Sequence, residues 1–280
     1  MLVDTHVHVI ASDTERYPLR PSGVGSQWFR EHPVSVEEFT AKASACGVDR
    51  AVLVQAFTAY GSDNSYVLDA AAAAPDRFVS VGIVDPADPE APATLRRLVE
   101  VPGFSGVRLF GIGSTTPKWF DGPAGVALWE VAAELDLRVV ATLLAPELPR
   151  LRRMTERFPE VPVVLDHCGF PDLRGGPPYP NAGSLFALAD HEPLHLKVTS
   201  HLLEEADHHS PGGAGAVVER LAAEFGVHRL VWGSDYPQTH DRSYAELVDL
   251  GRGACAGLPS DDRDAFLGGN ARRLWPALAR

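Results

Sequence analysis

The sequence predicts an α/β protein, a single (β/α)8 barrel of the TIM type. Short apolar runs rich in β-branched residues recur eight times, as expected for parallel strands that are buried on both faces. Helical patterns lie between these runs, and neither a linker nor a change of composition divides the 280 residues. We therefore expect one barrel domain over residues 1–280, since such barrels commonly have ~250 residues.

The strand-like runs are spread over the whole chain. We expect strands at Leu2–Val9, Ala51–Gln55, Phe78–Val84, Gly106–Phe110, Arg138–Leu143, Val161–His167, Leu194–Thr199 and Arg229–Ser234. None of these runs alternates apolar with polar residues, which is the pattern of a sheet with one face in water. The strands are therefore expected to be covered by helices outside the barrel.

The first helix has the clearest boundaries. Ser35 as the N-cap and Glu38 three residues later form a capping box. Val34 and Phe39 occupy the positions of a hydrophobic staple, and Gly47 can end the helix. Further helices are expected at Asn64–Ala74, Ala91–Glu100, Gly125–Leu135, Pro146–Phe158, Gly183–His191, Gly213–Phe225 and Ser243–Gly251, with a terminal helix from near Asn270.

Two connections are long for an α/β unit. Ala11–Pro33 follows the first strand, and Asp172–Asn181 follows the sixth. Both leave the carboxyl ends of strands, where barrel enzymes build their active sites. We expect these loops to form walls or lids over a substrate.

Charge and cysteine content exclude several classes of partner. Acidic residues outnumber basic ones by 37 to 25, so binding to nucleic acid or to a membrane surface is not expected. The 3 cysteines are too few and too scattered for a disulfide framework or a cysteine-based zinc site. No apolar run reaches the ~18 residues of a membrane span. The N-terminus lacks the basic segment of a signal peptide, so we expect a cytoplasmic protein.

Polar residues at the strand ends are the candidates for catalysis. His6 and His8 are two residues apart on the first strand, so their side chains share one face, which can be the barrel interior. Such a pair alone is equally compatible with structural histidines. However, His167 ends the sixth strand and Asp235 ends the eighth, where barrel enzymes place catalytic groups. Closing the barrel brings the eighth strand beside the first, so Asp235 should face His6 and His8.

Four motifs follow one another in order along the chain. They are Asp4–His8, Leu165–Pro171, Leu196–Ser200 and Trp232–Pro237. Together they resemble the amidohydrolase superfamily, and most nearly its amidohydrolase-related branch, which includes 2-pyrone-4,6-dicarboxylate hydrolase and sugar-acid lactonases. The resemblance covers essentially the entire chain and implies a hydrolase.

The chain also departs from this family. Many members carry a bridging Lys or Glu on strand four and a ligating His on strand five, and neither is present here. A binuclear centre is therefore not expected. In one arrangement that remains, His6, His8, His167 and Asp235 hold a single divalent ion, for which we favour weakly held Zn²⁺. In the other, which the resemblance to the dicarboxylate hydrolase implies, no metal binds and the histidines hydrogen-bond the carbonyl oxygen. In both, Asp235 is the general base.

Other polar residues are candidates for substrate binding. Arg108 can fork onto a substrate carboxylate or form a structural ion pair. Lys197 can point into the barrel or pair with Asp166. Weaker candidates lie on neighbouring loops, with His240 expected at the rim: Gln55, Tyr60, His201, Tyr236 and His240. His208 and His209 are expected in a solvated turn.

These residues predict a hydrolase that adds water to the carbonyl carbon of a small carboxylated lactone or cyclic ester. A metal-dependent, non-oxidative decarboxylase of a conjugated or aromatic acid is the first alternative. A non-catalytic, ligand-binding barrel is the second. The chain lacks a dinucleotide fingerprint and a Gly-x-Ser-x-Gly motif, so neither a nucleotide cofactor nor a serine nucleophile is expected. The expected partner is a small molecule, and the sequence is compatible with a homodimer.

Overall fold

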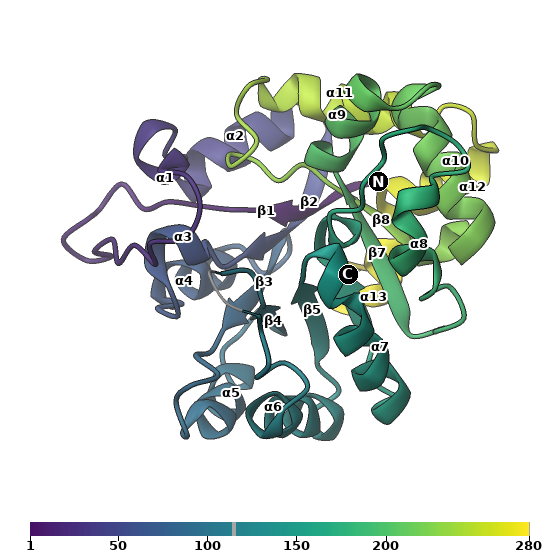
Figure 1. The fold of residues 1–280 in the computed structure, drawn as a ribbon. Coiled ribbons are helices and arrows are strands. Elements are labelled where there is room, and N and C mark those ends of the chain that lie inside the picture. The colour runs from purple at the N-terminus through teal and green to yellow at the C-terminus, as the bar shows by residue number, and fades with distance from the viewer. Residues whose placement is uncertain (114–115, 280) are drawn as a thin grey trace.

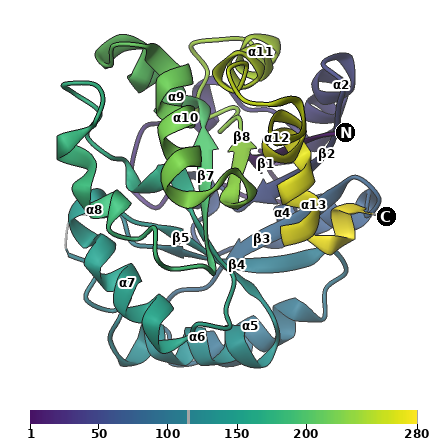
Figure 2. The ribbon, with the colours of Figure 1, turned by 90° about the vertical axis from the view of Figure 1, so that its right-hand side faces the viewer.

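The structure, a computed structural model, describes residues 1–113 and 116–279. Its 8 parallel strands are hydrogen-bonded in the order β1 to β8 and curl into a nearly closed barrel with helices around it (Figures 1 and 2). The strands are β1 (Leu2–Val7), β2 (Val48–Val54), β3 (Phe78–Ile83), β4 (Phe104–Phe110), β5 (Arg138–Thr142), β6 (Val163–Leu165), β7 (Leu194–Thr199) and β8 (Leu230–Gly233). The predicted (β/α)8 architecture is confirmed.

Helices connect successive strands along the outside of the barrel. They are α1 (Trp28–Glu31), α2 (Val36–Ala45), α3 (Phe57–Tyr60), α4 (Ser65–Ala73), α5 (Ala91–Val99), α6 (Pro123–Glu134), α7 (Leu148–Arg157), α8 (Gly183–Phe186), α9 (Ser200–His209), α10 (Gly213–Phe225), α11 (Tyr244–Ala254), α12 (Ser260–Asp264) and α13 (Asn270–Leu274). Within residues 1–113 and 116–279, none of them combines the length and the apolar character that crossing a membrane requires.

Two helices begin with the same local device. Ser35 and Glu38 form the predicted capping box of α2, with hydrogen bonds in both directions. Ser243 and Glu246 form a second capping box at α11, which the sequence analysis did not single out. Both satisfy backbone N–H groups that a helix otherwise leaves without partners.

Two expectations about the second half of the chain are wrong. The helix predicted over Gly183–His191 ends at Phe186. His208 and His209 lie in the last turn of α9 rather than in a solvated turn, although their side chains remain exposed. The buried residues of α9 include Leu202, Leu203 and Ala206, and this spacing places one apolar stripe against the barrel.

An inner apolar cluster fills part of the barrel. It consists largely of strand valines, including Val52, Val79, Val140 and Val164, and the chain end packs against it through Trp275. A second, larger cluster lies between the strands and the surrounding helices. Polar side chains are therefore concentrated at the carboxyl ends of the strands, where the interior is not filled by valine.

Candidate active site

The segment after β8 docks directly onto β1. The backbone N–H of Asp235 donates to the carbonyl of His6, and the N–H of His8 donates to the carbonyl of Tyr236. The distance from nitrogen to oxygen is 2.9 Å in both hydrogen bonds. Gly233 permits this approach, because a Cβ at that position would lie only 2.8 Å from the Cβ of His6. The structure thus brings Asp235 beside His6 in β1 and His8 just after it, as the sequence predicts.

The δ-nitrogens of His6 and His8 are held by groups that only accept hydrogen bonds. The Nδ1 of His8 lies 2.8 Å from the carbonyl oxygen of Val54. The Nδ1 of His6 lies 3.3 Å from the Oδ1 of Asp166. A neutral imidazole with its hydrogen on Nδ1 has a lone pair on Nε2. The surroundings of both δ-nitrogens are therefore compatible with the tautomer in which the ε-nitrogens carry a lone pair for a cation.

The two ε-nitrogens and one carboxylate oxygen face a common point. The Nε2 atoms of His6 and His8 are 3.2 Å apart. The Oδ1 of Asp235 lies 3.5 Å from each of them. Ligand atoms bound ~2.0–2.1 Å from a tetrahedral zinc are spaced by ~3.3 Å, so this triangle has the dimensions of a ligand set. The Oδ1 of Asp235 is buried and makes no hydrogen bond, which suits an atom that would bind a cation.

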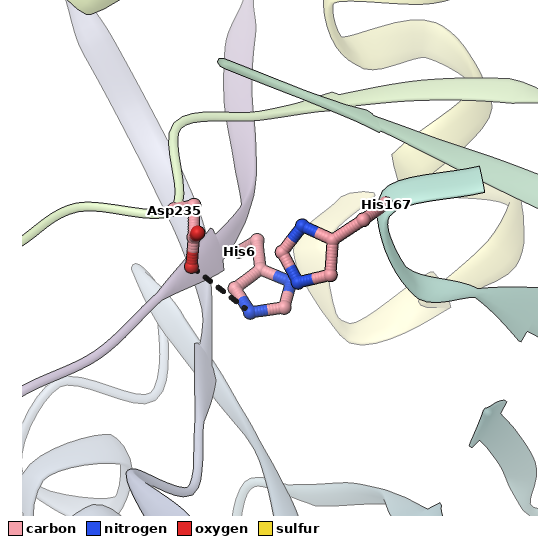
Figure 3. Close-up of side chains that lie close together, drawn as sticks. All are labelled: His6, His167 and Asp235. Carbon is pink, nitrogen blue, oxygen red and sulfur yellow. Dashed lines mark ion pairs between the residues drawn. The ribbon is translucent and has the colours of Figure 1, made fainter. Parts of the chain in front are cut away.

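His167 joins this group from the turn after β6. Within the described residues, potential ligand atoms of His6, His167 and Asp235 all lie within 4.8 Å of one another. Figure 3 shows the ring of His167 beside that of His6, with the carboxylate of Asp235 directed toward His6. The Nδ1 of His167 is 2.8 Å from the hydroxyl of Thr199, which leaves its Nε2 for the site. Imidazole nitrogens and one carboxylate suit a divalent cation such as Zn²⁺.

The backbone of the site is strained at two of these residues. His167 and Asp235 have φ angles of 53° and 58°, in the left-handed region that side-chain-bearing residues rarely adopt. Cys168, Gly169 and Phe170 continue the left-handed run after His167. The sequence predicted a strand that ends at His167. The left-handed run explains why β6 ends earlier, at Leu165. Such strain is concentrated at functional sites.

Burial sets the charges of the group. It lowers the pKa of His6 well below its usual range and that of His167 to about 4, so both rings are neutral near pH 7. Burial alone would raise the pKa of Asp235, but the surrounding imidazoles, first among them His167, hold that pKa below its ordinary value. An ionised carboxylate thus faces neutral imidazoles, as in a metal site.

Asp166 is the buried centre of a second cluster of charges. Its Oδ2 accepts hydrogen bonds from the Thr142 hydroxyl at 2.7 Å and the Arg108 Nε at 2.9 Å. Its Oδ1 lies 2.9 Å from the Lys197 Nζ. Burial would raise the pKa of Asp166, but Lys197, His6 and Arg108 together hold it well below the usual range. The sequence analysis named Asp166 only as a partner for Lys197 and missed its contact with His6.

Asp166 pairs with both buried cations. Arg108 forms an ion pair with Asp166 through its Nε and also lines the pocket beside His8 and His167, so its ion pair leaves it at the pocket wall. Lys197 points into the barrel but is fully buried against Asp166. Its assignment as a substrate-binding residue is therefore corrected to a structural ion pair.

Gln55 and Tyr60, two further candidates for substrate binding, make structural contacts with neighbouring loops. The side-chain amide of Gln55 donates to the carbonyls of Gly61 at 3.0 Å and Asp63 at 2.7 Å. The hydroxyl of Tyr60 accepts a hydrogen bond from the backbone N–H of Ala11 at 2.9 Å. Both side chains are buried, so they hold neighbouring loops in place.

Two further candidates lie after β8. Tyr236 is buried, with its ring 5.2 Å from that of Tyr244, so it packs in the core rather than lining the pocket. His240 lies at the rim, as predicted, where its ring stacks on His32 with 4.1 Å between ring centres. This stacking joins the loop after β1 to the loop after β8.

Asp4 is a functional residue that the sequence analysis missed. One of its carboxylate oxygens accepts from the backbone N–H of His6 at 3.1 Å and of Ser234 at 2.9 Å. The other accepts from the Tyr244 hydroxyl at 3.1 Å. Burial raises the pKa of Asp4 to about 6. Asp4 thus fixes β1 and the end of β8 behind the histidines, and a lone acid in an apolar run was the available signal.

The group opens into two adjoining hollows. The first has about 610 Å³ of empty space and is lined by His8, Arg108 and His167 among others. The second, with about 560 Å³, is lined by Asp235, and Phe170 and Gln238 form walls of both. The reacting centre therefore lies between two spaces.

Only one of the two long loops forms a wall of these hollows. Val24, Gly25 and Ser26 of the loop after β1 line the first hollow, which confirms the expectation for that loop. Among the described residues, none from Asp172–Asn181 lines either hollow, so the expectation for the loop after β6 is wrong. Tyr179 explains the difference, because it is buried and its hydroxyl accepts a hydrogen bond from Ser210.

Comparison with known proteins places this site in a family context. The sequence profile of the amidohydrolase family matches residues 3–277. The L-fucono-1,5-lactonase of Burkholderia ambifaria is 28% identical over 280 residues, which cover 98% of this chain and 94% of that protein. The D-galactarolactone isomerase of Agrobacterium fabrum is 27% identical over 263 residues, with 89% of this chain and 81% of that protein covered.

Solved structures share the fold over nearly the whole chain. A protein from Pseudomonas putida named 2-pyrone-4,6-dicarboxylic acid hydrolase has a TM-score of 0.80 and 25% identity, with 99% of this chain and 97% of that chain covered. An amidohydrolase from Burkholderia multivorans, solved with bound zinc, has a TM-score of 0.76 and 22% identity, with 99% of both chains covered.

Proposed function

This chain belongs to the amidohydrolase family and is an amidohydrolase-related enzyme, and from that premise we propose that it hydrolyses a small carboxylated lactone. One observation carries the proposal: the ε-nitrogens of His6 and His8 and the Oδ1 of Asp235 face one point at the mouth of a pocket. The sequence similarity to a lactonase, which extends along nearly the whole chain, supports the choice of a lactone.

We further propose that these residues hold one divalent cation, Zn²⁺, with His6, His8, His167 and Asp235 as the candidate ligands. When bound, such a cation polarises a carbonyl group and lowers the pKa of water. The metal-free alternative requires imidazole N–H groups that donate to the substrate carbonyl. The Val54 carbonyl oxygen and the Asp166 carboxylate face the Nδ1 atoms of His8 and His6, and this arrangement supports the tautomer with a lone pair on Nε2, which favours the metal arrangement.

Asp235 is the proposed general base. Its pKa lies below the ordinary value, so the carboxylate is ionised and can accept a proton from the attacking water. The water oxygen then bonds to the lactone carbonyl carbon. As the bond between this carbon and the ring oxygen breaks, the ring oxygen receives the proton from Asp235, and a hydroxy acid leaves.

Arg108 is the proposed partner of the substrate carboxylate. Its Nε is held by Asp166 and Thr142, each at 2.9 Å. These contacts fix the plane of the guanidinium group and leave its two terminal nitrogens for a planar, two-pronged contact. The substrate would then be oriented with its carbonyl toward His8 and His167, which line the same pocket.

Elemental analysis of the purified enzyme and lactone hydrolysis before and after chelation test this function. We expect about one divalent ion per chain, loss of hydrolysis on chelation, and recovery when Zn²⁺ is added back. Hydrolysis that persists in fully demetallated protein would contradict the metal arrangement but not the hydrolase. Release of carbon dioxide from a conjugated acid, with no lactone opened, would contradict the hydrolase and favour decarboxylation.

A further inference from the structure

Three partly exposed phenylalanines surround the mouth of the first hollow. Phe57 lies in α3 after β2, Phe110 ends β4, and Phe170 follows β6. The rings of Phe57 and Phe110 have centres 4.6 Å apart, at 30° to each other. In an eight-stranded barrel β2 and β6 are four strands apart, so Phe57 and Phe170 lie on opposite sides of the mouth.

The polar side chains in the lining of this hollow include Ser26, Thr58, Thr142 and Gln238. The Thr142 hydroxyl already donates to Asp166 and accepts from Arg108. His8 and His167 belong to the reacting centre. Val24 and Ile112 add apolar side chains to the lining. A ring hydroxyl that points at Phe57, Phe110 or Phe170 would lose a hydrogen bond with water that these aromatic rings cannot replace.

The charge of the hollow also limits the substrate. Arg108 is the only Lys or Arg among its described lining residues. Its Cζ lies 5.0 Å from the ring centre of Phe110, so the cation and the aromatic wall are adjacent. One carboxylate can pair with Arg108 while the ring attached to it lies against phenylalanine. A second carboxylate would have no cation of its own.

We propose that this pocket selects a lactone with a flat, apolar ring and a single carboxylate, in preference to polyhydroxylated lactones and dicarboxylates. The proposal rests on the proposed lactone hydrolysis. Phe57 and Phe110 provide the surface on which the ring lies, Phe170 bounds the opposite side, and Arg108 binds the carboxylate. The phenylalanines act on binding and leave the chemical step to Asp235 and the histidines.

Steady-state kinetics with three probes tests this specificity. The probes are dihydrocoumarin-6-carboxylate, L-fucono-1,5-lactone and 2-pyrone-4,6-dicarboxylate. We expect kcat/KM for the monocarboxylated aryl lactone to exceed that for each of the others by about 100-fold, the discrimination typical of a mismatch between an apolar pocket and polar groups.

Two variants link the preference to the aromatic wall. Phe57→Ala should raise the KM for the aryl lactone about 10-fold with little change in kcat and no change for fuconolactone. Phe57→Leu, which keeps an apolar side chain, should recover most of this loss. Phe110→Ala, at the partner ring, provides a second test should the first variant fold poorly.

Faster turnover of fuconolactone or of the dicarboxylate would overturn this inference while leaving lactone hydrolysis intact. Equal effects of Phe57→Ala on all three probes would also overturn it, because the wall would then not distinguish between rings. If none of the probes or other lactones is opened, the proposed function itself fails.

Discussion

At the scale of single residues, Asp166 shows how the site depends on buried charge. This carboxylate is fully buried and pairs with two buried cations, Lys197 at 2.9 Å and Arg108 at 2.9 Å. It also lies against His6, whose ring it orients toward Asp235. Orientation of a ligating imidazole by a carboxylate is a common feature of metal sites. Asp166 is thus a positioning residue for the histidines.

Removing this carboxylate should destabilise the protein strongly. Asp166→Asn leaves Lys197 buried without a counter-charge, so the free energy of unfolding should fall by about 3–5 kcal/mol. Urea unfolding of Asp166→Asn, Lys197→Met and the double variant measures the coupling between the two residues. Because Lys197→Met removes the unpaired charge, the double variant should be more stable than Asp166→Asn. Equal stability of the two would show that the pair is not coupled.

Sequence patterns identify some site residues better than others. His6, His8, His167 and Asp235 stand out because each is polar at the end of an apolar run. The protein contacts of Gln55, Tyr60 and Tyr236 could not be predicted, because a sequence does not reveal whether a polar side chain meets a ligand or another part of the protein. Asp4 and Asp166 were overlooked as positioning residues, since their roles depend on long-range contacts, such as the hydrogen bond from Tyr244 to Asp4.

At the scale of elements, local signals predict starts of helices well. The capping box of α2 follows from Ser35 and Glu38 alone. The end of β6 does not follow from its sequence, because the left-handed run from His167 to Phe170 is imposed by packing at the site. The loop after β6 was misjudged for a similar reason, since the partner of Tyr179 is Ser210, 31 residues away.

The two capping boxes should contribute to stability and not to catalysis. Replacing Ser35 or Ser243 by alanine removes the hydrogen bond that the backbone N–H of Glu38 or Glu246 donates to the serine Oγ. Each change should lower the free energy of unfolding by about 1 kcal/mol and leave kcat unchanged. Lys42→Ala, an exposed change within α2, is the matched control and should have little effect. A loss of kcat in Ser35→Ala would mean that α2 influences the site.

At the scale of the whole molecule, the barrel is stabilised by apolar packing and the site adds groups that depend on pH. The sequence predicted the alternation of strands and helices because each element has its own local pattern of apolar residues. The contact of β8 with β1 completes this architecture and creates the site, because it joins residues from the two ends of the chain. The backbone N–H of Ser234 donates to the Asp4 carboxylate, and that of Asp235 donates to the carbonyl of His6.

Acid should destabilise the folded protein through His167. Its pKa is about 4 in the folded state and ordinarily 6.5, so between these values the unfolded chain binds more protons. The stabilisation is complete above pH ~6.5 and is lost as the pH falls toward ~4, by about 3 kcal/mol in total. Urea unfolding from pH 7 to 4, with a chelator present, measures this slope.

His167→Asn provides the control for this pH dependence. Asparagine adopts left-handed backbone readily, so the turn after β6 should be retained. Asp4, whose raised pKa acts in the opposite direction, is present in both proteins and cancels in the comparison. The variant should therefore lose less stability on acidification than the wild type. Identical slopes in the two proteins would show that His167 is not a buried neutral imidazole.

The central claim is that Asp235 acts on substrate within the group of histidines, and Asp235→Asn tests it most directly. Asparagine keeps the size of the side chain and tolerates the φ of 58° at this position, so the melting temperature should change little. Removal of the general base should lower kcat for lactone hydrolysis by roughly 10³-fold. Asp249→Asn, the same change at a side chain of α11 that is 74% exposed, should retain full activity. A folded Asp235→Asn enzyme with kcat close to that of the wild type would contradict the account.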